Sequence, residues 1–528
     1  MSRRRPVETH NIYQDVHADA QKSGVAVEEV VTARITDDHL VTKSREALKL
    51  RSRAGFRLAL IMLVMAVNQA GYGIDWGVIS SINSNPLWHE YFGFENSGST
   101  LGVINALMTI GNFCGAPFLC VADKIGRRSV NFAGCLLTVI AAVHSSGLAK
   151  CRVSDGRPFR PGFRLVGIFG AFFQVGSLSI IGIMMGFTHW DSNWSWRAAF
   201  LIQAAFPAFV CVTIYFLCPE SPRYMVMKGQ REKARKMISQ YFTSSEDVNH
   251  PFVDVMMSQI DESIETSVVG FRATWDFRVF FNKATGFRTF ILALYSVFQQ
   301  WNGGGIIGMY LDPAMQTIGI TKKLDVLGIN LGLTATYFVF TLFGAYLIEL
   351  FRRRTLIFAG LISIIVAQIA VTLTSWQVQE QANAKYLSYL TVLWIFCFQV
   401  CSASFIATMH NLYPVELLSL PLRAKGMAMY TMFQGAAGVV HNYGISVGIQ
   451  KIGYKIWAVY IVYNFVQLII AYFVFPETGK LNLEEIDHIF ETKGANPVKL
   501  SVKVADAKWA SIKEDKMRAR NGGVVMHV

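Results

Sequence analysis

Charged residues are scarce in this chain of 528 residues, in which they make up only 16% of the sequence. Hydrophobic residues make up 52%, and the mean hydropathy is +0.34. A water-soluble protein carries about 25% charged residues, because most of its surface faces water. The composition therefore excludes an ordinary soluble protein and indicates a chain that lies mostly in lipid or against other helices.

The polar loops hold almost no cysteine. Of the eight cysteines, only Cys151 lies in a polar loop, and the others lie in or at the edge of apolar runs. This distribution argues against a disulfide framework and against a zinc site. The first 56 residues also lack a short apolar core followed by a cleavage site. We therefore expect no cleaved signal peptide, with the first apolar run serving as the insertion signal.

Long apolar runs, by contrast, are abundant. A hydrocarbon core about 30 Å thick needs roughly 20 mainly apolar residues to be crossed by a helix. Eleven runs reach or approach this length, so we predict an all-α polytopic membrane protein with about 11 transmembrane helices. The predicted spans are 57–80, 101–122, 130–147, 165–187, 197–218, 289–313, 326–349, 355–375, 387–408, 427–449 and 455–475.

Lys and Arg cluster in the tails and loops and give the chain a net charge of +13. Basic residues concentrate on the cytoplasmic side of membrane proteins, next to anionic lipid, so we assign this charge to topology and the lipid bilayer rather than to a nucleic-acid partner. The predicted order is a cytoplasmic tail (1–56), a first group of spans (57–218), a cytoplasmic linker with short helices (219–288), a second group (289–475) and a cytoplasmic tail (476–528).

The number of spans conflicts with the charges. Two cytoplasmic tails require an even number of crossings, whereas we count eleven spans. From a cytoplasmic start, the third span would export a loop with Arg152 and Arg157, and the basic linker would follow it outside. One crossing is therefore missing between about 148 and 164, a segment too polar and too short to cross without cover from neighbouring helices. We expect the chain as written to insert with mixed or inverted topology downstream of residue 148, or to fold poorly and be retained.

The two groups of spans resemble each other. Arginines follow the second span of each group, as Arg127-Arg128 and as Arg352 to Arg354. Each group closes on a Pro-Glu pair, at Pro219-Glu220 and at Pro476-Glu477. Duplicated six-helix halves are a recurrent transporter design, in which the halves rock about a substrate site at their interface.

An ordered series of motifs resembles the sugar-porter family of the major facilitator superfamily, most closely its fungal hexose and lactose-permease-like members. The resemblance covers about 57–491, apart from the gap. Each motif lies at the end of the helix where the family has it. The motifs are Gly73 to Gly77, Ser81 to Gly93, Asp123 to Arg128, Pro219 to Arg223, Gln299 to Gly303, Tyr413 to Glu416 with Arg423 to Gly426, and Pro476 to Thr478 with Leu483 to Ile486.

This resemblance implies a carrier that moves a hexose, or a small disaccharide such as lactose, by alternating access. It implies two six-helix halves, here one helix short, and no enzymatic activity, cofactor or metal. We expect a monomer in the plasma membrane, whose partners are the sugar, the lipid bilayer and, if transport is coupled, a proton. Proton symport and facilitated diffusion both stay open. The alternative is a non-transporting sugar sensor, an inactive paralogue or a truncated gene model that retains the fold.

Departures from the family pattern favour that alternative. The missing segment corresponds to the family's fourth helix, on which proton-coupled members carry an arginine that partners the first-helix aspartate, here Asp75. Gly305 stands where many sugar porters have an asparagine, and Asn411 occupies the place of an aromatic residue. Only about 50 residues follow the last span, which argues against a sensor with a long signalling domain.

Amide side chains within the apolar runs are the candidates for sugar binding. Gln299, Gln300, Asn302 and Asn442 each offer donors and an acceptor to hydroxyls without burying a net charge. Polar residues in membranes also serve interhelical packing, and this alternative stays open for all four. The resemblance favours Gln299 and Gln300 most, because they lie in the family's sugar-contacting motif, and it also favours Asn442.

Asp75 is the one carboxylate well inside a span of the first group. A buried charge in lipid is costly, so a carboxylate at this depth is a functional hypothesis by default, and here we consider proton coupling. The alternative is an aspartate held in an aqueous vestibule or by a backbone donor. His410 and His441 also lie in apolar runs, and we interpret them as polar packing residues.

Charges of both signs at the inner ends of the spans are predicted to form a cytoplasmic gate. Salt bridges between the halves would hold the outward-open state and break on inward opening. Single exposed pairs contribute only about 0–1 kcal/mol, so such a gate needs a network. Topology alone is the alternative explanation for the arginines. The residues are Asp123, Arg127, Arg128, Glu220, Arg223, Glu349, Arg353, Glu416 and Arg423.

Overall fold

The computed structural model describes residues 52–121, 125–145, 163–265, 276–381, 385–419, 422–492 and 495–520. These residues form helices joined by short connections, and none of them lies in a β-strand. Seven helical stretches are long and apolar enough to cross a membrane, and one of them, Lys425–Val474, takes in two consecutive helices. Phe172–Phe187 is a shorter apolar helix.

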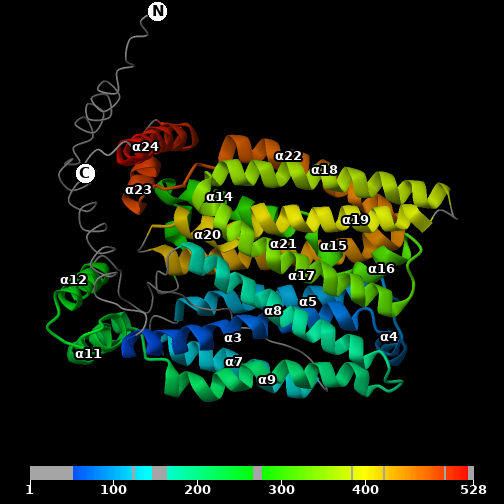
Figure 1. Ribbon diagram of the computed structural model, residues 1–528, viewed down its shortest axis with the longest axis horizontal. Coiled ribbons are helices and arrows are strands. Elements are labelled where there is room, and N and C mark those ends of the chain that lie inside the picture. Colours follow the sequence, from blue (N-terminus) through cyan, green and yellow to red (C-terminus); the bar gives the residue numbers. More distant parts are fainter. Residues whose placement is uncertain are drawn as a thin grey trace, which may run out of the picture. The chain divides into compact units, whose positions relative to one another are not determined.

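Each of the eleven predicted spans coincides with a long helical stretch (Figure 1). The first helix group is α3 Arg53–Ile82, α5 Ser99–Gly115 with η1 Ala116–Val121, α7 Arg127–Ser145, α8 Phe163–Phe187 and α9 Trp194–Leu217. The second helix group is α14 Lys283–Gln300 with α15 Gly304–Met309 and α16 Leu311–Gln316, α17 Lys323–Leu350, α18 Arg353–Glu380, α19 Lys385–Cys401 with η3 Ser402–Ala407 and α20 Met409–Leu417, α21 Arg423–Ile452 and α22 Ile456–Val474.

The long helices lie side by side, with α4 (Pro86–Phe92) and α16 at one end and α23 (Leu483–Glu491) and α24 (Pro497–Arg520) at the other (Figure 1). Two contacts join the groups: α5 packs along α21, and α8 packs along α17. Small residues allow close approach within the first group, since a Cβ on Gly73 would lie 1.7 Å from the carbonyl oxygen of Phe173. Van der Waals packing through small residues is the usual means of helix association in lipid.

The helices α7 and α8 run in the same direction although they are consecutive along the chain. Arg128, at the start of α7, pairs with Glu220 just after the end of α9, so α7 and α9 are antiparallel. Only residues 188–193 connect α8 to α9, and a connection this short joins antiparallel neighbours. Strict alternation would need one more crossing between α7 and α8, which supports the count made from the charges. Most of the segment 148–164, where we predict that one crossing is missing, lies outside the described residues.

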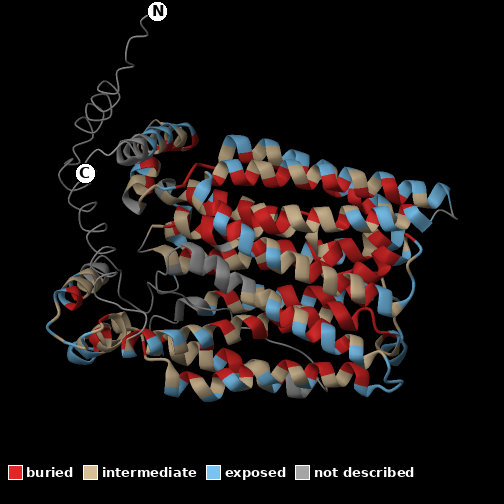
Figure 2. Cartoon of the chain, in the orientation of Figure 1, coloured by how far each residue is buried: buried red, intermediate tan, exposed pale blue. Residues whose placement is uncertain are grey.

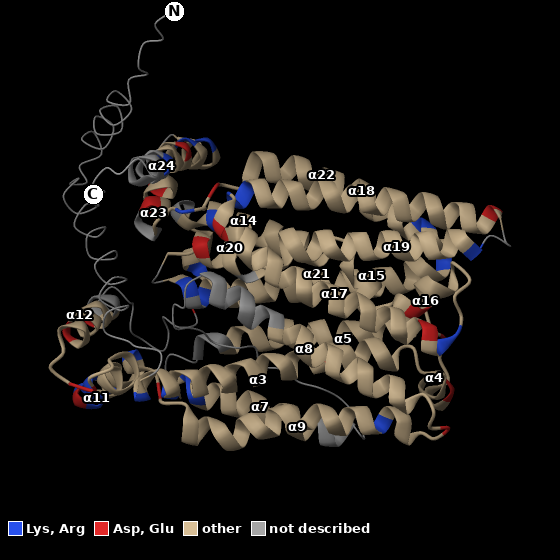
Figure 3. Ribbon diagram, viewed as in Figure 1, with Lys and Arg blue, Asp and Glu red and all other residues tan. Residues whose placement is uncertain are grey.

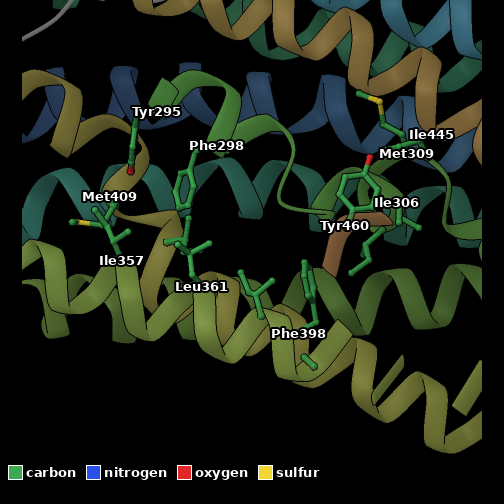
Figure 4. Packing of buried hydrophobic residues seen from close by; sticks show 14 of the residues in the cluster. Tyr295, Phe298, Ile306, Met309, Ile357, Leu361, Phe398, Met409, Ile445 and Tyr460 are labelled. Carbon is green, nitrogen blue, oxygen red and sulfur yellow. The ribbon is translucent and has the colours of Figure 1, made fainter. Parts of the chain in front are cut away.

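Burial follows the helix faces: buried residues lie toward the interior of the bundle and exposed apolar residues lie on the outward faces (Figure 2). The largest buried cluster is built mostly from the second group, with Leu101 and Met108 contributed by α5. In it, the Tyr295 ring lies 5.3 Å from Phe298 and 5.0 Å from Tyr413, between ring centroids. Figure 4 shows Tyr295 and Met409 at one side of this cluster and Ile306, Ile445 and Tyr460 at the other.

Charged side chains gather at the two ends of the long helices (Figure 3). At the α23–α24 end, Arg288 at the base of α14 pairs with Asp487 at 2.6 Å. The backbone N–H of Glu477 donates to Ser501 Oγ at 2.9 Å, and Arg352 pairs with Asp506. These contacts fix the two C-terminal helices to the second group.

A second compact unit comprises residues 225–265 together with residues 52–60. Its helices α11 (Arg231–Phe242) and α12 (Pro251–Glu265) pack through a small apolar core. The ion pairs Arg231–Asp261 at 2.5 Å and Arg235–Asp254 at 2.6 Å join the same two helices. With α10 (Pro222–Met227) and η2 (Arg278–Phe281), these are the short helices of the segment 219–288.

Candidate functional site

The helix that carries the predicted substrate residues is broken. α14 ends at Gln300 and α15 begins at Gly304, and between them Gly303 has a φ of +96°. Glycine adopts this left-handed conformation without the steric cost that a side chain brings. Asn302 Oδ1 accepts a hydrogen bond from the backbone N–H of Gly304 at 2.8 Å, so its side chain caps the start of α15.

Two amides from other helices hold the break in place. Gln368 of α18 and Asn464 of α22 both donate to the carbonyl oxygen of Asn302, at 2.9 Å and 3.2 Å. Asn464 also donates to Gln368 Oε1 at 2.8 Å. Sequence reasoning missed both residues. Each is an amide within an apolar run, which could have marked it as a candidate, but nothing in the sequence indicates that both bind the Asn302 carbonyl.

Gln299 contacts α21 through its side-chain oxygen. This atom accepts hydrogen bonds from the Tyr430 hydroxyl and from Gln434 Nε2. Gln434 was also missed, although it lies seven residues before His441 and therefore on the same face of α21.

Gln300 lies where the two helix groups meet. A Cβ on Gly438 of α21 would lie 3.5 Å from Gln300 Oε1 and 2.8 Å from Thr109 Cγ2 of α5. Gln300 is partly exposed, and its side chain makes no hydrogen bond within the described part of the chain. Its amide therefore has donors and an acceptor available for a ligand.

The two predicted asparagines have internal contacts. The side-chain oxygen of Asn302 accepts from the Gly304 N–H, and its main-chain carbonyl accepts from Gln368 and Asn464. Asn442 Nδ2 donates to the carbonyl oxygen of Asn105 at 3.4 Å, and the Asn442 carbonyl accepts from the Tyr310 hydroxyl at 2.8 Å. Both side chains are buried. The Asn442 contacts are of the interhelical packing kind, whereas the Asn302 side chain bonds within its own segment.

Asp75 has a neutral partner from α9. The carboxylate is buried at 5% exposure and accepts a hydrogen bond from Gln203 Nε2. Gln203 is fully buried, and its Oε1 has no hydrogen-bond partner among the described residues. An amide can donate to a carboxylate and can also accept from a protonated carboxyl, so this pair accommodates both protonation states.

Two of the predicted gate arginines pair with a carboxylate of their own helix group. Arg128 lies 3.8 Å from Glu220 and places its guanidinium 4.7 Å from the centre of the Tyr215 ring. Arg353 lies 3.0 Å from Glu416, which also accepts a hydrogen bond of 2.5 Å from the Thr478 hydroxyl. Neither pair crosses between the groups.

The remaining gate residues lie at helix ends. Arg127 begins α7, Arg223 lies in α10, Glu349 is the penultimate residue of α17, and Arg423 begins α21. Asp123 lies outside the described residues. Glu477, which the sequence placed only in a motif, accepts the backbone N–H groups of Arg353 and Arg354 at 3.0 and 3.1 Å. It thereby caps α18, where a negative charge is favoured by the helix dipole.

Hydrogen bonds join the two groups at the α4–α16 end. Asn83 donates to the carbonyl oxygen of Met309 at 3.1 Å, and Asn330 donates to Ser80 Oγ at 2.9 Å. The Ser446 hydroxyl donates to the Gly98 carbonyl at 2.7 Å. The groups are therefore tied together at this end.

Comparisons with known proteins agree with this architecture. The family model described as "Sugar (and other) transporter" matches residues 162–490. The chain is 24% identical to the MFS-type transporter oryC of Aspergillus oryzae, over 85% of this chain and 87% of that protein. It is also 24% identical to the high-affinity hexose transporter ght4 of Schizosaccharomyces pombe, over 82% and 83%. A third relative, at 24% identity over 84% and 62%, is the high glucose sensor RGT2 of Saccharomyces cerevisiae.

Solved structures show the same fold. The proton:xylose symporter XylE bound to 6-bromo-6-deoxy-D-glucose superposes with a TM-score of 0.64 at 17% identity, and the match covers 83% of this chain and 100% of that one. The inward open conformation of the xylose transporter XylE from E. coli gives the same score and identity, over 82% and 100%. The described residues thus adopt the major facilitator fold.

Proposed function

We propose that this chain, which belongs to the sugar transporter family of the major facilitator superfamily, carries a neutral sugar across its membrane by alternating access. Members of this family are multi-pass membrane transporters, which agrees with the apolar helices of this chain. Beyond membership of the family, we propose that the substrate is a neutral sugar, that the residues named above bind it, and that the chain lies in the plasma membrane.

The broken helix α14–α15 is the observation that carries the proposal. Transporter sites are typically formed by discontinuous helices where two repeats meet, and this break brings Gln300 to the contact of α5 with α21. The broken helix α14–α15 holds no charged residue between Thr289 and Tyr310, and α21 holds none between Gly426 and Gln450. A surface of amides and hydroxyls without charge favours a neutral polyol over a sugar acid or a sugar phosphate.

The contacts at the two ends suggest which state of the cycle this is. The hydrogen bonds between the groups at the α4–α16 end support a state closed at that end. At the other end, Arg128–Glu220 and Arg353–Glu416 pair within their groups. If both tails are cytoplasmic, the end closed by the hydrogen bonds between the groups is the outer one.

The test is uptake of labelled sugar by a cell that lacks its own hexose carriers, repeated with the purified chain in lipid vesicles. We expect uptake that saturates with substrate and counterflow in preloaded vesicles. Gln300→Ala in a correctly inserted chain should lower the apparent affinity. No uptake and no binding of any sugar by a well-folded chain would refute the proposal.

A sugar sensor is the second candidate, because one of the relatives is a glucose sensor. This chain spans only 62% of the length of that protein. A sensor would bind sugar without counterflow, so binding and flux measured on the same purified sample separate the two functions.

A further inference from the structure

His441 of α21 lies against Gly305 at the start of α15. A Cβ built on Gly305 would lie 2.2 Å from His441 Nε2 and 2.9 Å from Cδ2, with Ile445 Cδ1 at 3.0 Å. Real Cβ atoms do not approach other atoms this closely. The imidazole therefore occupies the space that a side chain at position 305 would take.

The two ring nitrogens of His441 have different surroundings. Nδ1 lies 3.1 Å from the hydroxyl of Tyr460 on α22, which fixes the orientation of the ring. Nε2 has no hydrogen-bond partner among the described residues, although the side chain is only 5% exposed. Buried polar atoms in proteins are nearly always paired, so an unpaired nitrogen at this depth needs an explanation.

The position of His441 Nε2 explains why it has no partner within the protein. Tyr430, Gln434 and His441 follow one another at intervals of four and seven residues and so share one face of α21. Tyr430 and Gln434 hydrogen-bond to Gln299 on α14, and His441 meets the start of α15 just beyond the break. Nε2 therefore lies on the same polar face as the glutamines proposed to bind sugar.

We infer that His441 Nε2 hydrogen-bonds a substrate hydroxyl, and that the Gly305–His441 pair sets which neutral sugar this carrier accepts. The inference rests on the proposed function and adds to it a residue that determines specificity. A neutral imidazole suits a hydroxyl because Nε2 can donate or accept according to the tautomer, and a hydroxyl can do either in return. Glycine at 305 is then required, because any side chain there would displace the ring.

Specificity for hydroxyl groups gives a direct test. A site built to hydrogen-bond a hydroxyl discriminates strongly against the analogue that lacks it. The purified full-length chain is tested for binding of D-glucose, D-galactose, D-xylose and lactose, and then of every monodeoxy form of the sugar that binds best. We expect the wild type to bind one monodeoxy form at least about tenfold more weakly than its parent, the loss typical of one hydrogen bond at a buried site.

His441→Phe keeps a ring of similar size but removes both nitrogens. We expect it to bind the parent sugar about tenfold more weakly and to bind parent and deoxy form equally, because the contact that distinguishes them is gone. Tyr460→Phe removes only the hydroxyl that orients the ring and should reduce the same discrimination in part. Thr391→Val, a buried change on α19 away from this face, should leave both affinities unchanged.

A second pair of variants covers the case in which His441→Phe folds poorly. Gly305→Ala should weaken parent binding by displacing the imidazole. Gly305→Ala combined with His441→Ala should remove the steric clash but should not restore the discrimination. Unchanged discrimination in His441→Phe or in the double variant, or equal binding of all monodeoxy forms by the wild type, would overturn the inference alone. A wild-type chain that binds none of the sugars would overturn the proposed function and this inference with it.

Discussion

At the scale of single residues, adjacent glutamines have different surroundings. The side-chain oxygen of Gln299 accepts two hydrogen bonds from α21, whereas the side chain of Gln300 makes no hydrogen bond to the described residues. Replacing Gln299 would remove the acceptor of Tyr430 and Gln434 as well as any sugar contact. A loss of binding in such a variant would therefore have two explanations. Gln300 gives the cleaner test of the site.

Gln300→Ala should weaken sugar binding by about 1–3 kcal/mol, because a bound sugar hydroxyl would lose its partner in a buried site. The measurement is a binding isotherm on the purified chain. Gln377→Ala is the matched control, since Gln377 is exposed near the end of α18. Equal affinity of Gln300→Ala and the control would remove Gln300 from the site.

Asp75→Asn tests energy coupling at the same scale. If Asp75 carries the proton, we expect this variant to lose accumulation against a gradient while keeping sugar exchange, because only proton loading needs an ionisable group. An asparagine can still accept from Gln203 Nε2, so the local structure should survive. Accumulation that persists in the variant, or an absence of pH dependence in the parent, would favour facilitated diffusion.

At the scale of helices, the central element is the break between α14 and α15. Its shape comes from Gly303, and its position comes from Gln368 and Asn464, which both bind the Asn302 carbonyl. Three helices of the second group are thereby linked at one backbone oxygen. Such a link would make the break a fixed part of the site rather than a flexible loop.

Gly303→Ala should destabilise the chain by about 1–3 kcal/mol, because its φ of +96° is unfavourable for alanine and the new Cβ would lie 2.4 Å from Gln368 Nε2. Thermal unfolding in detergent would show a lower midpoint. Gly308→Ala is the control, since nothing lies within 4 Å of a Cβ there, and it should leave the midpoint the same or higher. Equal midpoints for the two variants would show that the break tolerates a side chain.

At the scale of the whole molecule, hydropathy and charge predicted the helices but not their contacts. Each predicted span coincides with a helical stretch because about 20 apolar residues in lipid can satisfy their backbone only as a helix. The partners of Asp75 and Gln299 could not be predicted in this way. Gln203 lies 128 residues from Asp75, and Gln434 lies 135 residues from Gln299, so each pairing depends on how distant helices pack. The partners of the gate arginines could not be predicted either, because a charge at a helix end does not indicate which residue it will pair with.

The parallel directions of α7 and α8 lead to a prediction about topology. If one crossing is made between them, residues 219–288 face the cytoplasm, as their basic charge favours. In a chain with a helix inserted there, cysteine introduced at Ser258 should resist a membrane-impermeant thiol reagent in intact cells and react after permeabilisation, whereas cysteine at Ser192, between α8 and α9, should react from outside. In the chain as written, we expect cysteine at Ser258 to react from outside in part or completely, because its topology is mixed or inverted. A helix of about 20 apolar residues inserted between 148 and 164 should raise the folded yield and the uptake, because a polar segment crosses lipid with unsatisfied backbone groups. A Ser258→Cys that is protected throughout in the unmodified chain, together with full sugar uptake by that chain, would show that the segment already crosses; an insertion that lowers uptake would show that no crossing belongs there.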